Sequence, residues 1–363
     1  MTPKLKFTID LNAHPTPAEA RDASMQDPAF GRVFTDHMVV IKWTDELGWH
    51  DARVTARVPF SIDPACAVLH YGQEIFEGMK AYRGEDGALS LFRPFENARR
   101  FQHSAERLMM PSLPEDLFVE AVEQLVSIDR DWTPVGSGSL YLRPFMFATE
   151  VFLGIKPASA YTFCVIACPV GPYFKGGDRP VTVWMSEHYT RAAIGGTGAA
   201  KCGGNYAGGL AAQVEASRNG CDQVVFLDAS ERKWVEELGG MNIFFVMKDG
   251  SLVTPPLSGT ILPGITRASV IELAREAGHT VREERYSIDQ WASDAKSGDL
   301  AEAFVCGTAA TLVSIGEIRA ASGGFVIGAG AIGQTTAALK ARLNAIQRGQ
   351  QPGPAGWSHR IAL

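Results

Sequence analysis

The sequence predicts a mixed α/β protein of the α+β type, organised as two domains. The chain has 363 residues, more than one average domain of about 100 to 200 residues needs. Segments with the alternating apolar pattern of strands stand beside segments with helical periodicity in both halves. A glycine- and proline-rich stretch separates these halves. We therefore expect an N-terminal domain over residues 1–170, a linker over 171–185 and a C-terminal domain over 186–363.

The composition favours a soluble globular protein and excludes several classes of function. Hydrophobic residues make up 46% of the chain and charged residues 20%, which is typical of globular domains. The formal net charge is -6 and no basic run occurs, so we expect no nucleic-acid partner. No uncharged apolar stretch reaches ~18 residues, so no membrane span is expected. Residues 1–13 lack the apolar core of a signal peptide, and we expect a cytoplasmic protein.

The six cysteines are scattered, which argues against a disulfide framework or a zinc site. Only Cys164 and Cys168 lie close together in sequence. Both fall in one buried strand, where packing on the same face explains them. We therefore expect no metal ion in the protein.

The first half of the chain carries two arginines of interest. Its expected elements, after a polar arm over 1–30, are strands at 34–43 and 49–58, a short helix from 67 running into a strand, a strand at 89–93, helices from 94 and over 114–128, and strands at 140–148 and 161–170. Arg143 shares a strand face with Tyr141, because strand side chains alternate. A buried arginine is costly unless paired, so Arg143 belongs to an ion pair or binds a ligand. Arg100, on the helix from 94, could point into a cleft or into solvent.

The second half contains two turns suited to anions. Its expected elements are a strand at 181–186, a helix over 206–219, a strand at 223–227, a hairpin over 241–254, a helix over 266–277 and a strand from 303 that breaks at 307. The free N–H groups at the helix start near Thr266 form a natural anion site. The turn after Gly307, with the hydroxyl of Thr308, could also hold a phosphate.

Lys201 is the centre of the most unusual stretch of the sequence. Pairs of glycines at 195–196 and 203–204 flank it, Tyr206 follows, and two carboxylates stand at Glu236 and Glu237. A lysine whose pKa is lowered by desolvation or by a neighbouring cation is a nucleophile that can form a Schiff base. The alternative is a solvated loop lysine among turn-forming glycines.

The combination of residues points to one cofactor. The chain has no P-loop, no zinc-ligand spacing and no Gly-x-Ser-x-Gly elbow. A lysine for an imine, a carboxylate for a ring nitrogen and a phosphate cradle together indicate pyridoxal 5'-phosphate. Lys201 would then act as general base and acid, and Tyr206 could hydrogen-bond the ring oxygen.

Motifs along the chain identify a family resemblance. They are Phe34-Thr-Asp-His-Met, His70-Tyr, Phe76-Glu-Gly-Met-Lys-Ala, Phe92-Arg-Pro, Leu140-Tyr-Leu-Arg-Pro, Cys168-Pro-Val-Gly-Pro-Tyr, Gly203-Gly-Asn-Tyr, Gly240-Met-Asn, Leu262-Pro-Gly-Ile-Thr-Arg and Cys306-Gly-Thr-Ala. With these motifs in this order, the chain resembles the branched-chain amino acid aminotransferases, which are pyridoxal-phosphate enzymes of fold type IV. The resemblance implies a smaller N-terminal α/β domain, a larger C-terminal pseudobarrel domain carrying the cofactor lysine, and a homodimer.

The resemblance also implies roles for individual residues. Lys201 would be the catalytic and cofactor-binding lysine, Glu237 rather than Glu236 would bind the pyridine nitrogen, and Tyr206 would lie beside the ring oxygen. The other expected cofactor contacts are Arg100, Arg191, Leu262, Ile265, Thr266 and Thr308, with the arginines on the phosphate. The expected substrate contacts are Phe34, Tyr71, Phe76, Tyr141, Arg143, Tyr173 and Ala309. Arg143 would meet the distal carboxylate of glutamate, and the loop 153–155 would reach the partner subunit.

The activity implied by the resemblance is transfer of an amino group between L-leucine, L-isoleucine or L-valine and 2-oxoglutarate, giving 2-oxo acids and L-glutamate. The chain departs from some relatives at Gly240, where they carry a threonine. It also has Ala310 and Val313 where vertebrate relatives carry a redox pair of cysteines. Two alternatives keep the cofactor: a D-amino acid aminotransferase and an aminodeoxychorismate lyase-like enzyme. A third is a non-catalytic module that binds a phosphorylated metabolite.

Overall fold

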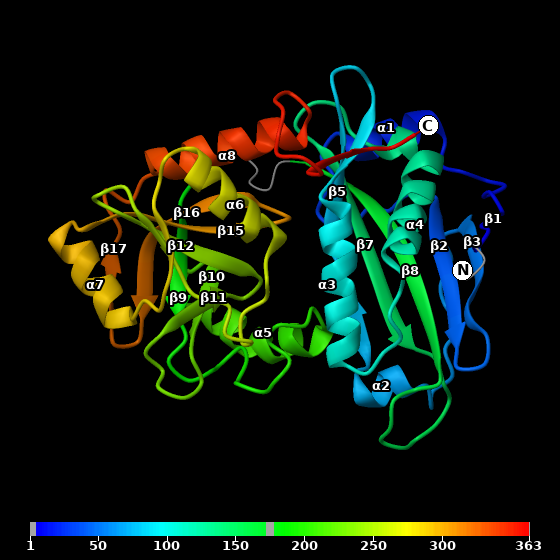
Figure 1. Ribbon diagram of the computed structural model, residues 1–363, viewed down its shortest axis with the longest axis horizontal. Coiled ribbons are helices and arrows are strands. Elements are labelled where there is room, and N and C mark those ends of the chain that lie inside the picture. Colours follow the sequence, from blue (N-terminus) through cyan, green and yellow to red (C-terminus); the bar gives the residue numbers. More distant parts are fainter. Residues whose placement is uncertain (1–4, 172–177, 363) are drawn as a thin grey trace. The chain divides into compact units, whose positions relative to one another are not determined.

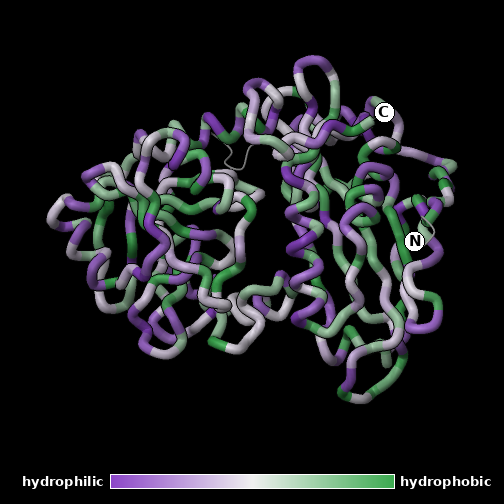
Figure 2. Tube along the Cα trace, viewed as in Figure 1, coloured by the Kyte–Doolittle hydropathy of each residue, from purple (hydrophilic) through white to green (hydrophobic). Residues whose placement is uncertain are grey.

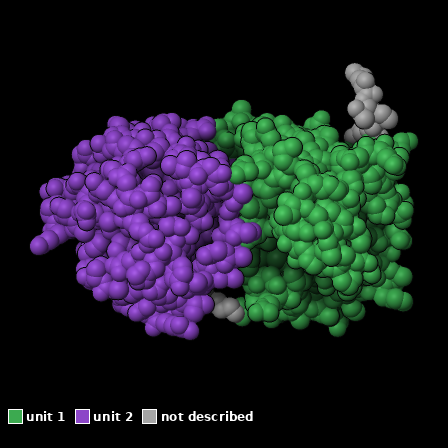
Figure 3. Space-filling model, turned by 90° about the horizontal axis from the view of Figure 1, so that it is seen from below, with its two compact units in different colours: residues 1–173, 200–203, 346–363 green, residues 174–199, 204–345 purple. Residues whose placement is uncertain are grey.

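The computed structural model describes residues 5–171 and 178–362, and Figure 1 shows their helices and strands. The chain divides into two compact units (Figure 3). The first comprises Met1–Tyr173, Ala200–Gly203 and Ile346–Leu363, and the second Phe174–Ala199 and Gly204–Ala345. Lys201 therefore belongs to the first unit, and so does the end of the chain. Part of the expected linker 171–185 lies outside the described residues, and its last five residues form a strand, Val181–Met185.

The first unit is built on one nine-stranded sheet. Its strands are β1 (Thr8–Ile9), β2 (His37–Thr44), β3 (Gly48–Ala56), β4 (Glu74–Phe76), β5 (Met79–Arg83), β6 (Leu89–Phe92), β7 (Ser139–Ala148), β8 (Ala160–Val170) and β18 (Ser358–Arg360). They run in the order β1-β3-β2-β8-β7-β5-β6-β18, with β4 paired to β7. All pairs except β1–β3 are antiparallel. Figure 2 shows long hydrophobic stretches along these strands.

Helices α3 and α4 pack on one face of this sheet, and the side chains of Tyr141 and Arg143 lie on the other. The helices of the unit are α1 (Ala18–Met25), α2 (Ala67–Tyr71), α3 (Pro94–Arg107), α4 (Glu115–Ile128) and the 3-10 turn η1 (Arg130–Trp132). Phe101 of α3 and Phe118 of α4 pack their rings on Phe163 of β8, with centroids 5.5 and 5.9 Å away. Leu140 and Leu142 of β7 belong to the same core. Because side chains alternate along a strand, Tyr141 and Arg143 point to the opposite face, as predicted.

The second unit contains a closed barrel of six strands. Its elements are β9 (Val181–Met185), β10 (Gln223–Leu227), β11 (Val235–Leu238), β12 (Met241–Met247), β13 (Leu252–Thr254), β14 (Val281–Glu283), β15 (Leu300–Gly307), β16 (Thr311–Ala320), β17 (Gly323–Val326), α5 (Gly203–Arg218), α6 (Ile265–Glu276), α7 (Ile288–Ser297) and α8 (Gln334–Gln347). The ring runs β11-β10-β9-β16-β15-β12 and closes where β12 pairs with β11. Closure leaves these six strands without a free edge. β13, β14 and β17 extend the sheet outside the ring.

Most expected elements occur close to their predicted bounds, including the hairpin of β12 and β13 and the helix α6. The expected N-terminal arm is an exception, because it contains α1 and pairs β1 with β3. The helix expected to begin at Tyr206 begins at Gly203, whose N–H donates to a carboxylate oxygen of Glu74. All six cysteines are buried and unpaired. Across the described part of the chain, we find no helix with the length and apolar character needed to cross a membrane.

Candidate functional site

The backbone of Lys201 is fixed from two sides within the first unit. Its N–H donates to the hydroxyl of Ser104 on α3 at 2.9 Å, and its carbonyl accepts from the N–H of Phe76 at 2.9 Å. The Ser104 hydroxyl in turn donates to the carbonyl of Arg100 at 3.0 Å. The lysine is thus held between the end of β4 and helix α3, and its position does not depend on loop conformation alone.

The Lys201 side chain lies over an aromatic ring that a second cation shares. Its Nζ is 5.0 Å from the ring centroid of Phe76, and the guanidinium carbon of Arg143 is 4.6 Å from the same centroid. Both distances fall within the range of cation–π contacts. The lysine is only half-buried. Phe76, expected in the substrate pocket, therefore lies beside both the expected catalytic lysine and the expected substrate arginine.

A buried acid, Glu77, follows this aromatic residue. It is fully buried and receives a bidentate pair from Arg100, with Nε to Oε1 and Nη2 to Oε2 both at 2.8 Å. The side-chain amide of Asn97 donates to Oε2 at 2.7 Å. Burial opposes the charge, but Arg100, Lys201 and Asn97 together hold the pKa of Glu77 below its ordinary value. Arg100 is buried, so the solvated alternative for it is wrong.

Glu77, Asn97 and Ser104 were not among the residues expected in the site, although the sequence contains a signal for them. Glu77 stands between an aromatic residue and a glycine at the junction of two strands, where a solvated acid is not expected. Its partners Asn97 and Arg100 lie one helical turn apart on α3, on the same face. A carboxylate inside a strand pair and polar residues on the buried face of a helix predict such a pair.

Tyr141 and Arg143 lie together on the face of β7 that the helices leave open. The Arg143 Nη2 donates to the Tyr141 hydroxyl at 3.0 Å. Gly78 gives this hydroxyl room, since a Cβ there would overlap it. Among the described residues no hydrogen-bond partner reaches the buried Nε of Arg143. Phe34 packs against the cluster of Tyr141 with Cys168, so the structure gathers three expected substrate residues here.

Glu74 adds a carboxyl group to this face. Burial raises its pKa, while the N–H of Gly203 and the charge of Arg143 act in the opposite direction. The Glu74 oxygen approaches Gly203 so closely that a Cβ at this position would collide with it. A side chain at position 203, where helix α5 begins after the lysine, would therefore require the Glu74 carboxyl group to move.

One expected substrate contact of the first unit, Tyr71, is not gathered in this cluster. Tyr71 ends α2 and is 42% exposed, with its ring 6.3 Å from that of Phe152. Tyr173 lies outside the described residues. The loop 153–155 is strongly exposed, with Leu153 at 69% and Ile155 at 95%.

In the second unit, Arg191 and Glu237 form a buried ion pair. The Arg191 Nη1 is 2.8 Å from Glu237 Oε1, and the same oxygen accepts from the N–H of Leu262 at 3.0 Å. Arg191 also donates to the carbonyls of Thr260, at 2.9 Å, and of Gly198, at 3.3 Å. Glu237 lies within β11. Arg191, expected at a phosphate, thus contacts the carboxylate expected at the ring nitrogen.

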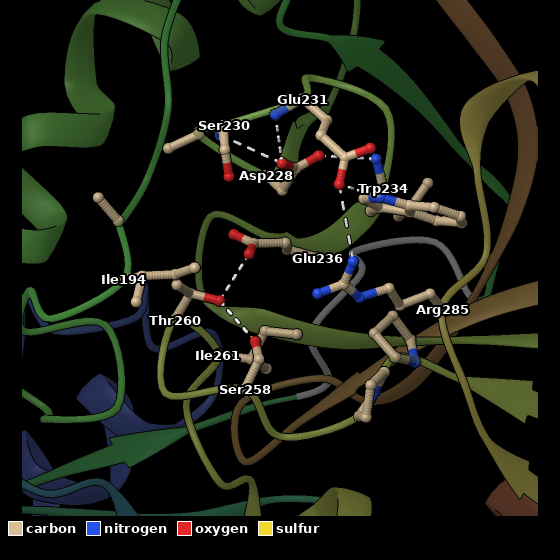
Figure 4. Close-up of a pocket in the computed structure, with 15 residues that line it drawn as sticks. Ile194, Asp228, Ser230, Glu231, Trp234, Glu236, Ser258, Thr260, Ile261 and Arg285 are labelled. Atoms are coloured by element: carbon tan, nitrogen blue, oxygen red, sulfur yellow. Dashed lines mark hydrogen bonds and ion pairs between the residues drawn. The ribbon is translucent and has the colours of Figure 1, made fainter.

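Glu236 takes part in a separate contact, which Figure 4 shows. Its Oε1 accepts from the Thr260 hydroxyl at 2.5 Å, and Ser258 lies 2.8 Å from that hydroxyl. These three residues line a cavity of about 280 Å³ that also contains Trp234 and Arg285 (Figure 4). Burial raises the pKa of Glu236, although the Thr260 hydrogen bond counteracts it.

The N-terminus of α6 begins with the expected residues Ile265 and Thr266. The first N–H groups of a helix have no partner within the helix and attract anions. Asn242 holds the preceding turn, because its side-chain amide donates to the Leu262 carbonyl at 3.0 Å. A Cβ at Gly264 would collide with the Asn242 side chain. The motifs at 240–242 and 262–267 therefore contact each other, and Asn242 fixes the turn that precedes α6.

The remaining expected residues lie in short segments near β15 and α5. Thr308 and Ala309 form the turn between β15 and β16 and are half-buried. Burial raises the pKa of the adjacent Cys306 thiol to about 12, which makes it unreactive. Tyr206 lies in the first turn of α5, and a Cβ added at Gly240 would be 3.6 Å from its ring.

Comparison with known proteins gives the family. A model of the family described as Amino-transferase class IV matches residues 74–318, which is more than half of the chain. The chain belongs to the class IV aminotransferases. A probable branched-chain-amino-acid aminotransferase of Streptomyces coelicolor is 52% identical over 98% of this chain and 99% of its own length. A branched-chain-amino-acid aminotransferase of Mycolicibacterium smegmatis is 50% identical over 98% of each chain.

Solved structures of this class share the fold. A branched-chain amino acid aminotransferase from Escherichia coli has a TM-score of 0.72 and 27% identity, covering 90% of this chain and 100% of that one. The branched-chain aminotransferase of Thermoproteus uzoniensis with norvaline has a TM-score of 0.73 and 26% identity, covering 89% and 100%. The expected fold of type IV is confirmed. This class IV aminotransferase thus combines the nine-stranded sheet with the six-stranded barrel.

Proposed function

We propose that this class IV aminotransferase is a branched-chain amino acid aminotransferase that uses pyridoxal 5'-phosphate. It reversibly transfers the amino group between L-leucine, L-isoleucine or L-valine and 2-oxoglutarate, giving branched-chain 2-oxo acids and L-glutamate. The main support is identity of 50% or more to such aminotransferases over nearly the whole chain. No geometric observation favours the D-amino acid or lyase alternatives.

The residues present have the chemistry that pyridoxal 5'-phosphate needs. When bound, this cofactor supplies a ring that accepts the electron pair released as the amino acid loses its Cα proton. Glu237 is a buried carboxylate stabilised by Arg191 and the Leu262 N–H, which suits a protonated ring nitrogen. The residues proposed to hold the cofactor are Lys201, Arg100, Arg191, Tyr206, Glu237, Leu262, Ile265, Thr266 and Thr308.

Lys201 is proposed as the residue that moves the proton. A free amine can take a proton at Nζ and return it. The hydrogen bonds of its backbone with Ser104 and Phe76 fix the position from which the side chain extends. The neighbouring Glu77 forms a buried ion pair with Arg100, so its negative charge is compensated by that arginine.

The two arginines expected at the phosphate, Arg100 and Arg191, each have a buried carboxylate partner. Arg100 gives Nε and Nη2 to Glu77, and its contact with the phosphate stays part of the proposal. Arg191 forms an ion pair with Glu237 and donates to the carbonyls of Thr260 and Gly198, and we assign it to Glu237. The main phosphate contacts would then be the N–H groups at the start of α6 and the Thr308 hydroxyl.

The open face of the first sheet suits both classes of substrate. Phe34, Phe76 and Tyr141 supply aromatic surface for a branched side chain. Arg143 has a buried Nε without a hydrogen-bond partner among the described residues, and a carboxylate of glutamate or 2-oxoglutarate would satisfy it. Tyr71, Tyr173 and Ala309 stay in the proposal as further substrate contacts.

The proposal includes a homodimer located in the cytoplasm. The exposed apolar side chains of the loop 153–155 support a contact with a partner subunit. Sedimentation of the purified protein would test the dimer.

The activity can be tested by the visible absorption of the purified protein loaded with pyridoxal 5'-phosphate. We expect L-leucine to remove the yellow band and 2-oxoglutarate to restore it. D-leucine serves as the control and should leave the band unchanged. A band that responds to D-leucine alone, or to neither, would contradict the proposed function.

A further inference from the structure

Glu236 stands at an irregularity of the barrel beside the proposed ring-nitrogen carboxylate. In the pairing of β10 with β11, Phe226 faces Glu237 and the next residue, Leu227, faces Val235. Glu236 is therefore the extra residue of a β-bulge. Bulges redirect side chains and occur often beside active sites. Two consecutive carboxylates consequently reach different atoms of one neighbouring segment, 260–262.

The first contact joins Glu236 to Thr260. Glu236 is 7% exposed, and its Oε1 accepts from the Thr260 hydroxyl at 2.5 Å (Figure 4). Since this hydroxyl has one hydrogen and gives it to Glu236, Ser258 must donate to Thr260 across their 2.8 Å contact. The hydroxyl of Thr260 is thus fixed by an acceptor and a donor.

The second set of contacts joins the same segment to Glu237. The carbonyl of Thr260 accepts from Arg191 Nη1 at 2.9 Å, and this nitrogen is 2.8 Å from Glu237 Oε1. The N–H of Leu262 donates to that oxygen at 3.0 Å. A displacement of Thr260 would therefore disturb the Arg191 ion pair and the Leu262 hydrogen bond of this Glu237 oxygen.

We propose that Glu236 is a positioning residue for Glu237, acting through Thr260 and Arg191. The Glu236 carboxylate anchors the Thr260 side chain, which keeps the Thr260 carbonyl against Arg191 and the Leu262 N–H against Glu237. Loss of the anchor weakens the Arg191–Glu237 pair and so changes how Glu237 stabilises a protonated ring nitrogen. This inference rests on the proposed use of pyridoxal 5'-phosphate.

The charges around Glu236 come from several elements. Asp228, after β10, raises the pKa of Glu236 further, and Arg191 and Arg285 lower it. Glu231 lines the same cavity, but it accepts from the Trp234 indole at 3.0 Å and lies 3.7 Å from Arg285. Glu231 therefore provides a matched control, since it is an acid of the same cavity without a contact to Thr260.

The test compares variants loaded with pyridoxal 5'-phosphate by the pH at which the visible band of the bound cofactor titrates. Thr260→Val removes the donor and keeps the carbonyl, and Glu236→Ala removes the acceptor. We expect both to move the titration midpoint in the same direction and to lower kcat about 10-fold with little change in KM. The double variant should add little to either change, because both act through one contact.

The conservative variants separate positioning from a general loss of structure. Glu236→Gln and Thr260→Ser keep an acceptor and a hydroxyl, so their midpoints should stay near that of the wild type, as should that of Glu231→Gln. If Glu236→Ala does not fold, the titration midpoint of Thr260→Val alone tests the proposal. An unchanged midpoint in Thr260→Val, or additive effects in the double variant, would overturn the inference. Failure of the wild type to bind the cofactor would instead overturn the proposed function and this inference with it.

Discussion

The two units each contain a buried arginine–carboxylate pair, and the two pairs are built differently. Arg100 gives Glu77 a bidentate pair, and Asn97 on the same helix adds a third donor. Arg191 Nη1 lies 2.8 Å from Glu237 Oε1, and Arg191 is itself held by backbone carbonyls. The first pair joins helix α3 to the β4–β5 junction, whereas the second joins loops to β11. We therefore expect the first to act mainly on stability and the second mainly on the reaction.

The largest effect on activity is expected from removal of the Lys201 side chain, which lies beside the Arg100–Glu77 pair. Lys201→Ala should lower transamination more than ~10³-fold, because no other group would replace its nucleophilic and proton-transfer roles. Steady-state turnover of L-leucine with 2-oxoglutarate measures the loss. Lys296→Ala, on an exposed position of α7, is the control and should be unaffected. Substantial turnover by Lys201→Ala would refute the assigned role.

Substitution in the second pair should reduce the rate without unfolding the protein. Glu237→Gln is expected to lower kcat about 10²- to 10³-fold, since an ionised carboxylate stabilises charge on the ring and a neutral amide does not. Glu236→Gln, next to it on β11, should have a much smaller effect. If the two effects were reversed, the wrong carboxylate would have been assigned.

Substitution in the first pair should instead reduce stability. Glu77→Gln leaves the buried Arg100 without its bidentate partner, which we expect to cost about 3–5 kcal/mol in the free energy of unfolding. Urea unfolding of the cofactor-free protein measures this. Glu96→Gln breaks the exposed pair with Arg99 on the same helix and should cost less than about 1 kcal/mol. Equal losses would mean that the buried pair is not the stabilising element.

Arg143 is a third arginine to compare with these two pairs. In the described structure it has no carboxylate partner within ion-pair distance. Arg143→Gln should raise KM for 2-oxoglutarate about 10-fold or more, because it loses a charged donor for the distal carboxylate. KM for L-leucine should change less than about 3-fold. Arg99→Gln, exposed on α3, is the control. A larger change for leucine than for 2-oxoglutarate would contradict the role.

The smallest expected effect is a difference in pH dependence between two acids. The pKa of Glu77 is depressed below 4.5, so its contribution to stability is present above pH 4.5 and is lost as the pH falls through its folded pKa. The pKa of Glu236 is raised, so its contribution falls as the pH rises from 4.5 through its folded pKa. Urea unfolding between pH ~2 and ~8 should therefore show Glu77→Gln approaching the wild type below pH 4.5. Glu236→Gln should gain relative stability as the pH rises, and parallel profiles would reject this difference.

The sequence by itself determined the elements, the family and the expected site residues. Alternation predicted that Tyr141 and Arg143 share a face, and the glycine and proline signals predicted the turn before α6. The expectation of a lysine enzyme followed from the types of residues around Lys201 and not from their contacts. Such local patterns are readable because backbone periodicity depends on neighbouring residues alone.

The pairing of charges was decided only by the tertiary structure. Glu77 meets Arg100, and Arg191 meets Glu237, because strands and helices distant in sequence pack against each other. The extra residue at Glu236 depends on the register between β10 and β11, which is set across the sheet by the packing of both strands. Side-chain partners and strand register are properties of the packed chain: the sequence around Glu77 and on α3 indicates buried polar residues, but only the packing decides which of them meet.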